Sequence, residues 1–209
     1  ERTDVSEARY RADPPRGKRP AQRSASLSSR LRVEAVGASG GVGLAAVQGA
    51  KLAGLRVIGT ASSDEGKSLV TENGADSVFD HTNEDHFGEI FDYSASSGVD
   101  VIIEMLANEN LERDFEALAM FGRIVVVGNR GSIQFTPRLA MTKDASIFGM
   151  SLFNASFSAM EEIHRAIGAG LESGSLRPFV SQRFSLEEAP AAHHAIINNK
   201  AVGKIVLLP

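Results

Sequence analysis

The sequence predicts an α/β protein built on a doubly wound, parallel Rossmann sheet, and three observations lead to this prediction. A glycine run at 37–43 (Gly-Ala-Ser-Gly-Gly-Val-Gly) joins a short apolar stretch to a helical pattern. Beyond it, short apolar segments alternate with amphipathic ones. Two of the apolar segments, 99–104 and 123–128, are nearly continuous, which is typical of strands buried on both faces of a parallel sheet.

The glycine run marks the first crossover of this sheet. It follows a strand at 31–36 and opens a helix at 42–53, and a second strand follows at 56–59. One glycine allows a sharp turn, another lets the backbone approach a pyrophosphate, and a third lets helix and strand pack closely. The free amides and positive end of the helix then face the phosphates.

The later elements follow in regular order. A capping box at Ser62 and Glu65 opens a helix that ends at Asn73-Gly74. We then expect a strand at 77–79, a helix at 85–93, a strand at 99–104, a helix at 111–119 and strands at 123–128 and 145–149. An amphipathic helix at 158–172 begins with a cap at Ser158 and Glu161, and the rest of the chain predicts an extended segment at 177–184, a helix at 186–198 and a strand at 203–209.

The composition bounds the class of protein. The 209 residues include no cysteine, so the sequence offers neither a disulfide nor a cysteine zinc site, as is compatible with a reducing cytoplasm. No apolar run approaches the roughly 20 residues that a membrane span needs, so we expect no membrane partner. We divide the chain into a disordered basic segment at 1–30, a nucleotide-binding domain at 31–172 and a C-terminal helix–strand appendage at 173–209.

The basic N-terminal segment has several interpretations. Residues 1–32 hold nine Arg and Lys against four Asp and Glu, and they show no hydrophobic period. A solvated tail is the simplest interpretation. Its four acids argue against a transit peptide, whereas its net charge allows weak, salt-sensitive contact with nucleic acid.

The end of the second strand favours NADP over NAD. Dinucleotide-binding units for NAD carry an acid there, which binds the ribose hydroxyls and would repel a 2′-phosphate. Here the position is occupied by 59–63 (Gly-Thr-Ala-Ser-Ser), and the nearby Asp64 and Glu65 are placed in a first helical turn. Lys67 and Arg130 are candidate phosphate partners, with a simple exposed helix position as the favoured alternative for Lys67.

Other candidate sites are weaker. His81 follows a strand at the edge where open α/β sheets bind ligands, although a surface-loop histidine is an equal alternative. His193 and His194 point in different directions on a helix, which argues against a metal pair. Tyr93 is followed four residues later by Ser97, so the Tyr-x-x-x-Lys arrangement of short-chain reductases is absent.

Several of these segments together resemble one family. They are 37–43, 58–61 (Ile-Gly-Thr-Ala), 73–76 (Asn-Gly-Ala-Asp), 78–81 (Val-Phe-Asp-His), 102–108 (Ile-Ile-Glu-Met-Leu-Ala-Asn), 122–128 and 203–206 (Gly-Lys-Ile-Val). From about residue 37 to its end, the chain resembles the zeta-crystallin-like NADPH:quinone oxidoreductases of the medium-chain dehydrogenase/reductase superfamily. The resemblance implies zinc-independent hydride transfer from NADPH to a quinone or enone.

The same resemblance implies a set of cofactor-binding residues: Ser39, Gly40, Gly41, Val42, Ser62, His81, Asn110, Val127, Gly128, Asn129, Arg130, Met150, Ser151 and Leu152. The first four would contact the phosphates, and Ser62 would lie near the adenosine phosphate. His81 and Asn110 would line the groove. Residues 127–130 would follow the fifth strand toward the nicotinamide side, and 150–152 would close the groove after the sixth strand. The resemblance also implies a homo-oligomer that pairs through the edge strand near 145–152.

The sequence also departs from this family. The family carries a large N-terminal lobe that forms a wall of the substrate pocket and packs on the C-terminal helix and strand, and residues 1–32 do not resemble it. We therefore expect cofactor binding with weak or absent turnover from these 209 residues. Glu34 places a charge in a central parallel strand, which is costly unless that edge of the sheet is wet.

Two other classes of function stay open. One is a non-enzymatic nucleotide-binding or RNA-binding protein that uses the basic segment. The other is a different Rossmann enzyme, such as a methyltransferase, which the missing acid after the second strand disfavours.

Overall fold

The computed structural model describes residues 31–198 and 202–209. The predicted disordered segment at 1–30 lies outside the described residues, so its disorder and its contact with RNA stay predictions.

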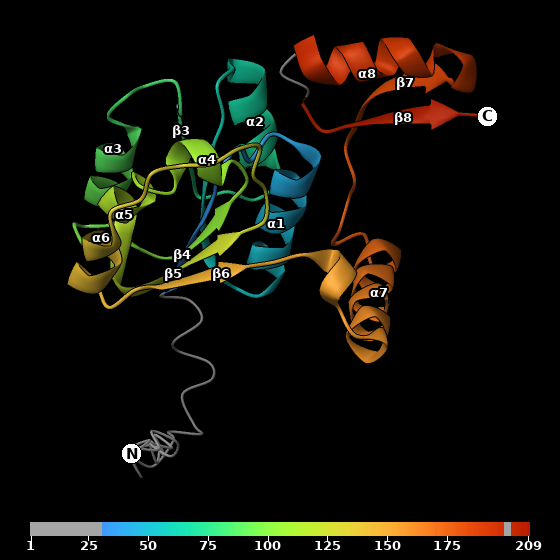
Figure 1. The fold of residues 1–209 in the computed structure, drawn as a ribbon. Coiled ribbons are helices and arrows are strands. Elements are labelled where there is room, and N and C mark those ends of the chain that lie inside the picture. The colour runs from blue at the N-terminus through green and yellow to red at the C-terminus, as the bar shows by residue number, and fades with distance from the viewer. Residues whose placement is uncertain (1–30, 199–201) are drawn as a thin grey trace, which may run out of the picture.

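A six-stranded sheet forms the centre of the molecule (Figure 1). Its strands are β1 (Arg32–Ala35), β2 (Arg56–Thr60), β3 (Ser77–Phe79), β4 (Val99–Glu104), β5 (Leu118–Val126) and β6 (Ser146–Gly149). They lie in the order β3-β2-β1-β4-β5-β6, and every neighbouring pair is parallel. The predicted doubly wound Rossmann sheet is confirmed. The strand order reverses between β1 and β4, which is where such sheets bind ligands.

Helices cover both faces of the sheet. The helices α1 (Gly41–Leu52) and α2 (Asp64–Glu72) bury Leu44, Val47 and Val70 against one face. On the other face, α3 (His86–Tyr93), α5 (Asp114–Ala117) and α6 (Pro137–Thr142) pack around a second apolar cluster. Each face therefore has its own core, and β1 and β4 lie between the two.

The helix predicted at 111–119 is confirmed only at 114–117, and its predicted extent is wrong. The chain forms a single turn, α4 (Ala107–Asn110), and then the short α5, and β5 begins at Leu118, earlier than the predicted strand at 123. Leu118 pairs with Val99 of β4 and is fully buried, so strand pairing overrides the helical pattern. The entry into β5 is irregular, because Phe121 adopts a left-handed φ of 61°.

Two predicted helix caps are also wrong by one or two residues. Ser63, not Ser62, accepts a hydrogen bond from the Gly66 amide at 3.1 Å and caps α2. Ser156, not Ser158, caps α7 (Phe157–Glu172) through the Ala159 amide at 3.2 Å. In both cases the cap is the serine with extended backbone immediately before the first helical residue.

The C-terminal segment lies beside the sheet in two parts (Figure 1). The first part is the 3-10 turn η2 (Leu152–Asn154) with α7. The second part, which we call the C-terminal lobe, consists of β7 (Val180–Ser185), the 3-10 turn η3 (Leu186–Glu188), α8 (Ala189–Asn198) and β8 (Lys204–Leu208). Strands β7 and β8 pair in parallel, as a sheet of their own. The predicted apolar face of α7 is not packed, since Ile163, Ile167 and Leu171 are all exposed.

This lobe joins the Rossmann domain at the glycine turn. The Gly203 amide donates to the Ser39 carbonyl at 2.7 Å, and Gly203 forms a parallel bridge with Gly40. Among the described residues, no helix combines the length and apolar character required to cross a bilayer.

Candidate nucleotide-binding site

The glycine turn between β1 and α1 is held by backbone constraints that require glycine. Gly37 adopts a left-handed φ of 61°, and its amide donates to the Thr60 hydroxyl at 2.9 Å. A Cβ added at Gly43 would lie 2.5 Å from the Ala38 Cα, so only glycine lets α1 pack this closely on the turn. The predicted turning and packing glycines are therefore confirmed, whereas the glycine that approaches a pyrophosphate stays a prediction.

A groove runs along the carboxyl edge of the sheet from this turn. Its larger part is a cavity of approximately 840 Å³, which contains these predicted site residues: Gly40, Gly41, Val42, Val127, Gly128 and Arg130. A second cavity of approximately 430 Å³ continues past the end of β6 and is lined by the predicted Asn129, Met150 and Ser151. Both cavities share Val127 and Gly128, so we treat them as one groove. The structure brings together most of the residues predicted to bind a cofactor.

The C-terminal lobe supplies the opposite wall of this groove. Ile196, Ile197 and Lys204 line the larger cavity. The aliphatic part of Lys204 covers Gly41, because a Cβ at Gly41 would lie only 2.4 Å from the Lys204 Cε. Lys204 was not predicted to be a site residue. The sequence segment that could have pointed to it is 203–206, which contributed to the family resemblance but was assigned no function.

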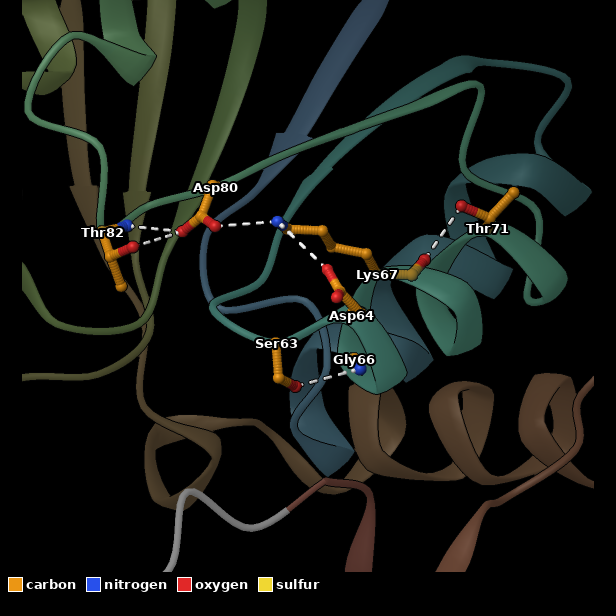
Figure 2. Close-up of polar contacts among 7 residues, drawn as sticks. All are labelled: Ser63, Asp64, Gly66, Lys67, Thr71, Asp80 and Thr82. Atoms are coloured by element: carbon orange, nitrogen blue, oxygen red, sulfur yellow. Dashed lines mark hydrogen bonds and ion pairs between the residues drawn. The ribbon is translucent and has the colours of Figure 1, made fainter.

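A charged cluster lies beyond the ends of β2 and β3, and its residues do not line either of the two cavities (Figure 2). The Lys67 Nζ lies 2.7 Å from the Asp80 Oδ2 and 3.7 Å from the Asp64 Oδ1. The Asp80 Oδ1 also accepts from the Thr82 amide at 2.9 Å and from the Thr82 hydroxyl at 2.6 Å. We call Lys67, Asp80 and Thr82 the β3-edge cluster. It places a cation beside the first turn of α2.

The charges of the β3-edge cluster stabilise one another. The hydrogen bond to Asp80 is the main cause that raises the pKa of Lys67. The same bond, followed by the bonds from Thr82, lowers the pKa of Asp80. Both groups are therefore charged at neutral pH. Lys67 is half-buried and ion-paired, which differs from the simple exposed helix position favoured from the sequence. Asp80 was missed, although it directly follows a predicted strand.

Five predicted residues do not line the two cavities. Ser39 contributes its carbonyl to Gly203, and its side chain lies beside Gly66 at the start of α2. Ser62 and His81 are half-buried just beyond β2 and β3. Asn110 donates from its side-chain amide to Glu104, at 3.3 and 3.4 Å. Leu152 lies in η2 and is 53% exposed.

Comparison with known proteins identifies the family. The model of the zinc-binding dehydrogenase family matches residues 41–167. The chain belongs to this family. The resemblance to the medium-chain dehydrogenase/reductase superfamily is thereby confirmed. Within it, the chain is 46% identical over 173 residues to the quinone oxidoreductase of Rattus norvegicus, covering 82% of this chain and 53% of that protein.

Solved structures agree with this assignment. The crystal structure of AibC aligns with a TM-score of 0.76 at 34% identity, covering 87% of this chain and 49% of that one. The structure of Escherichia coli quinone oxidoreductase complexed with NADPH aligns with a TM-score of 0.79 at 23% identity, covering 87% and 58%, and shows the shared fold. The chain spans about half the length of the curated relatives that it matches.

The family's description names zinc, and the residues described here do not fit a zinc site. The chain contains no cysteine. Within residues 31–198 and 202–209, no three His, Asp or Glu side chains gather closely enough to hold a metal ion. We therefore derive no step through zinc.

Proposed function

We propose that this chain is the cofactor-binding part of an NADPH-dependent quinone oxidoreductase. The observation that carries the proposal is the groove at the glycine turn, where the start of α1, the end of β5 and a C-terminal lysine face one cavity. The similarity to quinone oxidoreductases supports the reaction, and the geometry supports the nucleotide.

The phosphate end of the groove is suited to an anion. Backbone amides of 40–42 open α1, and the positive end of this helix faces the cavity. Lys204 and Arg130 add two cationic side chains to its lining. Within residues 31–198 and 202–209, no acidic residue lines this cavity, so a pyrophosphate would meet no like charge from them.

The β3-edge cluster supports a preference for NADPH. The segment after β2 carries serines where an NAD-binding chain carries an acid, and Ser63 caps α2 beside it. Lys67 lies between this segment and Asp80, so we propose that it contacts the 2′-phosphate while Asp80 holds its amino group in place. NADH lacks the phosphate and gains nothing from Lys67.

Hydride transfer needs the nicotinamide end of the groove. NADPH supplies the hydride when bound, and a quinone or enone accepts it. The wall at 127–130 and the turn at 150–152 would position the ring. Met150 and Leu152 are each about half exposed. Because no described residue covers them, we propose that these 209 residues bind the cofactor well and turn over a quinone weakly.

The outer edge of the sheet supports a second proposal, that two copies of the chain associate. Strand β6 is an edge strand, and Ile147 and Phe148 on it are exposed. An unpaired edge with apolar side chains favours pairing with another chain. Sedimentation analysis would show a dimer that Ile147→Lys converts to a monomer, and a wild-type monomer at all concentrations would contradict this proposal.

Calorimetric titration with NADPH and NADH tests the main proposal. We expect clear binding of NADPH, weaker binding of NADH, and loss of affinity for both in Lys204→Ala, because that lysine faces the shared phosphates. Arg165→Ala, on the exposed surface of α7, is the matched control and should bind like the wild type. A folded chain that binds neither nucleotide would overturn the proposal.

A further inference from the structure

Three carboxyl groups lie in the core beneath the groove. Glu34 of β1, Glu104 at the end of β4 and Asp114 at the start of α5 each have no solvent exposure. Glu34 is in register with Ile102, so it shares a sheet face with Ile102 and with Glu104 two residues later. This is the face that α3 and α5 cover. We call the three residues the carboxyl cluster. Glu34 therefore has no access to water, although the sequence predicts that a charge at this position is costly unless the sheet edge is solvated.

The hydrogen bonds of the carboxyl cluster are unevenly distributed. Glu104 accepts from the Leu106 amide and from the Asn110 side chain. Neither oxygen of Glu34 has a hydrogen-bond partner, and neither oxygen of Asp114 has one of good geometry. Among the described residues, no Lys or Arg forms an ion pair with any of the three. An unpaired buried charge is very costly, so we expect Glu34 and Asp114 to hold protons.

The electrostatics agree with this distribution of protons. Burial, and then the nearby Glu104, raises the pKa of Glu34 to about 8. Burial, followed by repulsion from Glu104 and Glu34, raises the pKa of Asp114 further. Burial also raises the pKa of Glu104, but its hydrogen bonds oppose this effect. The hydrogen bonds that Glu104 accepts favour its charged form, so we expect the cluster to carry its charge on Glu104 and its protons on Glu34 and Asp114.

Other titratable groups surround the cluster without neutralising it. His86 of α3 is also buried, and its Nδ1 lies 2.6 Å from the Asn83 carbonyl. Arg113 and Glu116, on either side of Asp114, pair with each other. Lys143 directs its amino group to the Leu118 carbonyl. A substitution at Glu34 leaves these other groups in place, so it isolates the effect of the Glu34 proton.

Glu104 connects this cluster to the groove. Its side chain holds the amide of Asn110, a predicted cofactor-binding residue. Its backbone carbonyl accepts from the Val127 amide at 2.8 Å and from the Gly128 amide at 3.1 Å, and both residues line the groove. A Cβ at Gly128 would lie 2.1 Å from the Met105 carbonyl, so this wall fits tightly against the end of β4. Movement of Glu104 would therefore reach two parts of the groove.

We propose that the carboxyl cluster positions Asn110 and the Val127–Gly128 wall for the nucleotide, with Glu34 as the residue whose proton keeps Glu104 in place. This inference rests on the proposed nucleotide binding. When Glu34 loses its proton, two like charges face each other in a dry core, and Glu104 is pushed from its position. Nucleotide affinity then falls as the pH rises through the pKa of Glu34.

The test compares the full wild-type chain with Glu34→Gln, which cannot ionise, by NADPH calorimetry between pH 6 and pH 9. We expect the wild-type Kd to rise as much as about tenfold at pH 9, where about one Glu34 in ten keeps its proton, and the Kd of Glu34→Gln to stay flatter. Glu161→Gln, at an exposed position on α7, should follow the wild type. Glu34→Leu provides a second nonionisable variant if the buried amide prevents folding.

Side-chain amide resonances of Asn110 give a readout that a purely structural role would not move. In ¹⁵N spectra they should shift with the same midpoint as the wild-type affinity and stay constant in the Glu34 variants. Superimposable profiles of wild type and variants, with NADPH bound normally, would overturn this inference alone. Absence of NADPH binding at every pH would overturn the proposed function and the nucleotide part of this inference together. The Asn110 resonances would then still show whether Glu34 acts on that side chain.

Discussion

The β3-edge cluster and the carboxyl cluster are both built around acidic residues, and they behave in opposite ways. Asp80 has a lysine and a threonine as partners, and its pKa is lowered. Glu34 has no partner and no solvent, and its pKa is raised. An acid at the edge of the sheet therefore acts through its charge, whereas an acid in the core acts through its proton. Substitutions in the two clusters separate these two roles.

The largest expected effect is on the pH dependence of folding. Because the folded pKa of Glu34 lies above its unfolded value, its contribution to stability is complete below about pH 4.5 and is lost as the pH rises to about 8. The loss is of the order of 5 kcal/mol. Glu34→Leu removes this pH-dependent loss. The unfolding free energy of the variant should therefore exceed that of the wild type by the largest amount at pH 9. Denaturant unfolding across this pH range measures the difference, and a constant gap at all pH values would contradict the account.

The next effect is on cofactor preference at the β3 edge. Lys67→Ala should weaken NADPH binding about tenfold and leave NADH binding unchanged, because only NADPH carries the 2′-phosphate. Arg56→Ala, at an exposed strand start, is a matched loss of positive charge. Competition calorimetry with both nucleotides measures the ratio of the Kd for NADH to the Kd for NADPH. Equal weakening of both by Lys67→Ala would remove the proposed role of Lys67.

A smaller effect tests the helix cap beside Lys67. Ser63→Ala should cost about 1 kcal/mol of unfolding free energy, because the Gly66 amide loses its partner. Ser62→Ala serves as the control, since Ser62 does not cap α2. Thermal or denaturant unfolding of both variants measures this loss of unfolding free energy. An equal loss in both variants would contradict the assignment of Ser63 as the cap.

The smallest effect is the acid-side stability of the β3 edge. The lowered pKa of Asp80 means that its contribution is present above the unfolded value of about 3.8 and is lost as the pH falls below it. Asp80→Asn should therefore lower the unfolding midpoint slightly at pH 7 and by less at pH 2–3. High salt should shrink the difference, because the pair is near the surface. If the difference in unfolding midpoint between wild type and Asp80→Asn grew as the pH fell, the lowered pKa of Asp80 would be contradicted.

Local pattern was enough to predict the main sheet. Strands β3 and β4 have the predicted bounds, because apolar runs between turn residues leave few alternatives. The helix predicted at 111–119 ends two residues early because Leu118 pairs with Val99, nineteen positions earlier, and no local pattern contains that pairing. The caps failed because adjacent serines are equivalent in sequence and differ only in backbone conformation.

The groove was predictable only in part. The glycine run at 37–43 predicts a nucleotide turn together with the strand before it and the helix and strand after it, all of which are local patterns. Lys204, in contrast, reaches Gly41 from the other end of the chain. Likewise, the sequence showed that Glu34 is an unusual charge in a central strand. It did not show that Asp114 lies near Glu104, because that proximity depends on how α5 packs on the sheet. Long-range packing thus decides which polar residues meet.

The most direct test of the central claim is a titration of the ¹⁵N-labelled chain with NADPH at pH 7, followed by amide spectra. The account predicts concentration-dependent shifts at 39–42, 127–130 and Lys204, with smaller shifts at Asn110. Shifts confined to the exposed face of α7, or no shifts in a folded chain at millimolar NADPH, would contradict it.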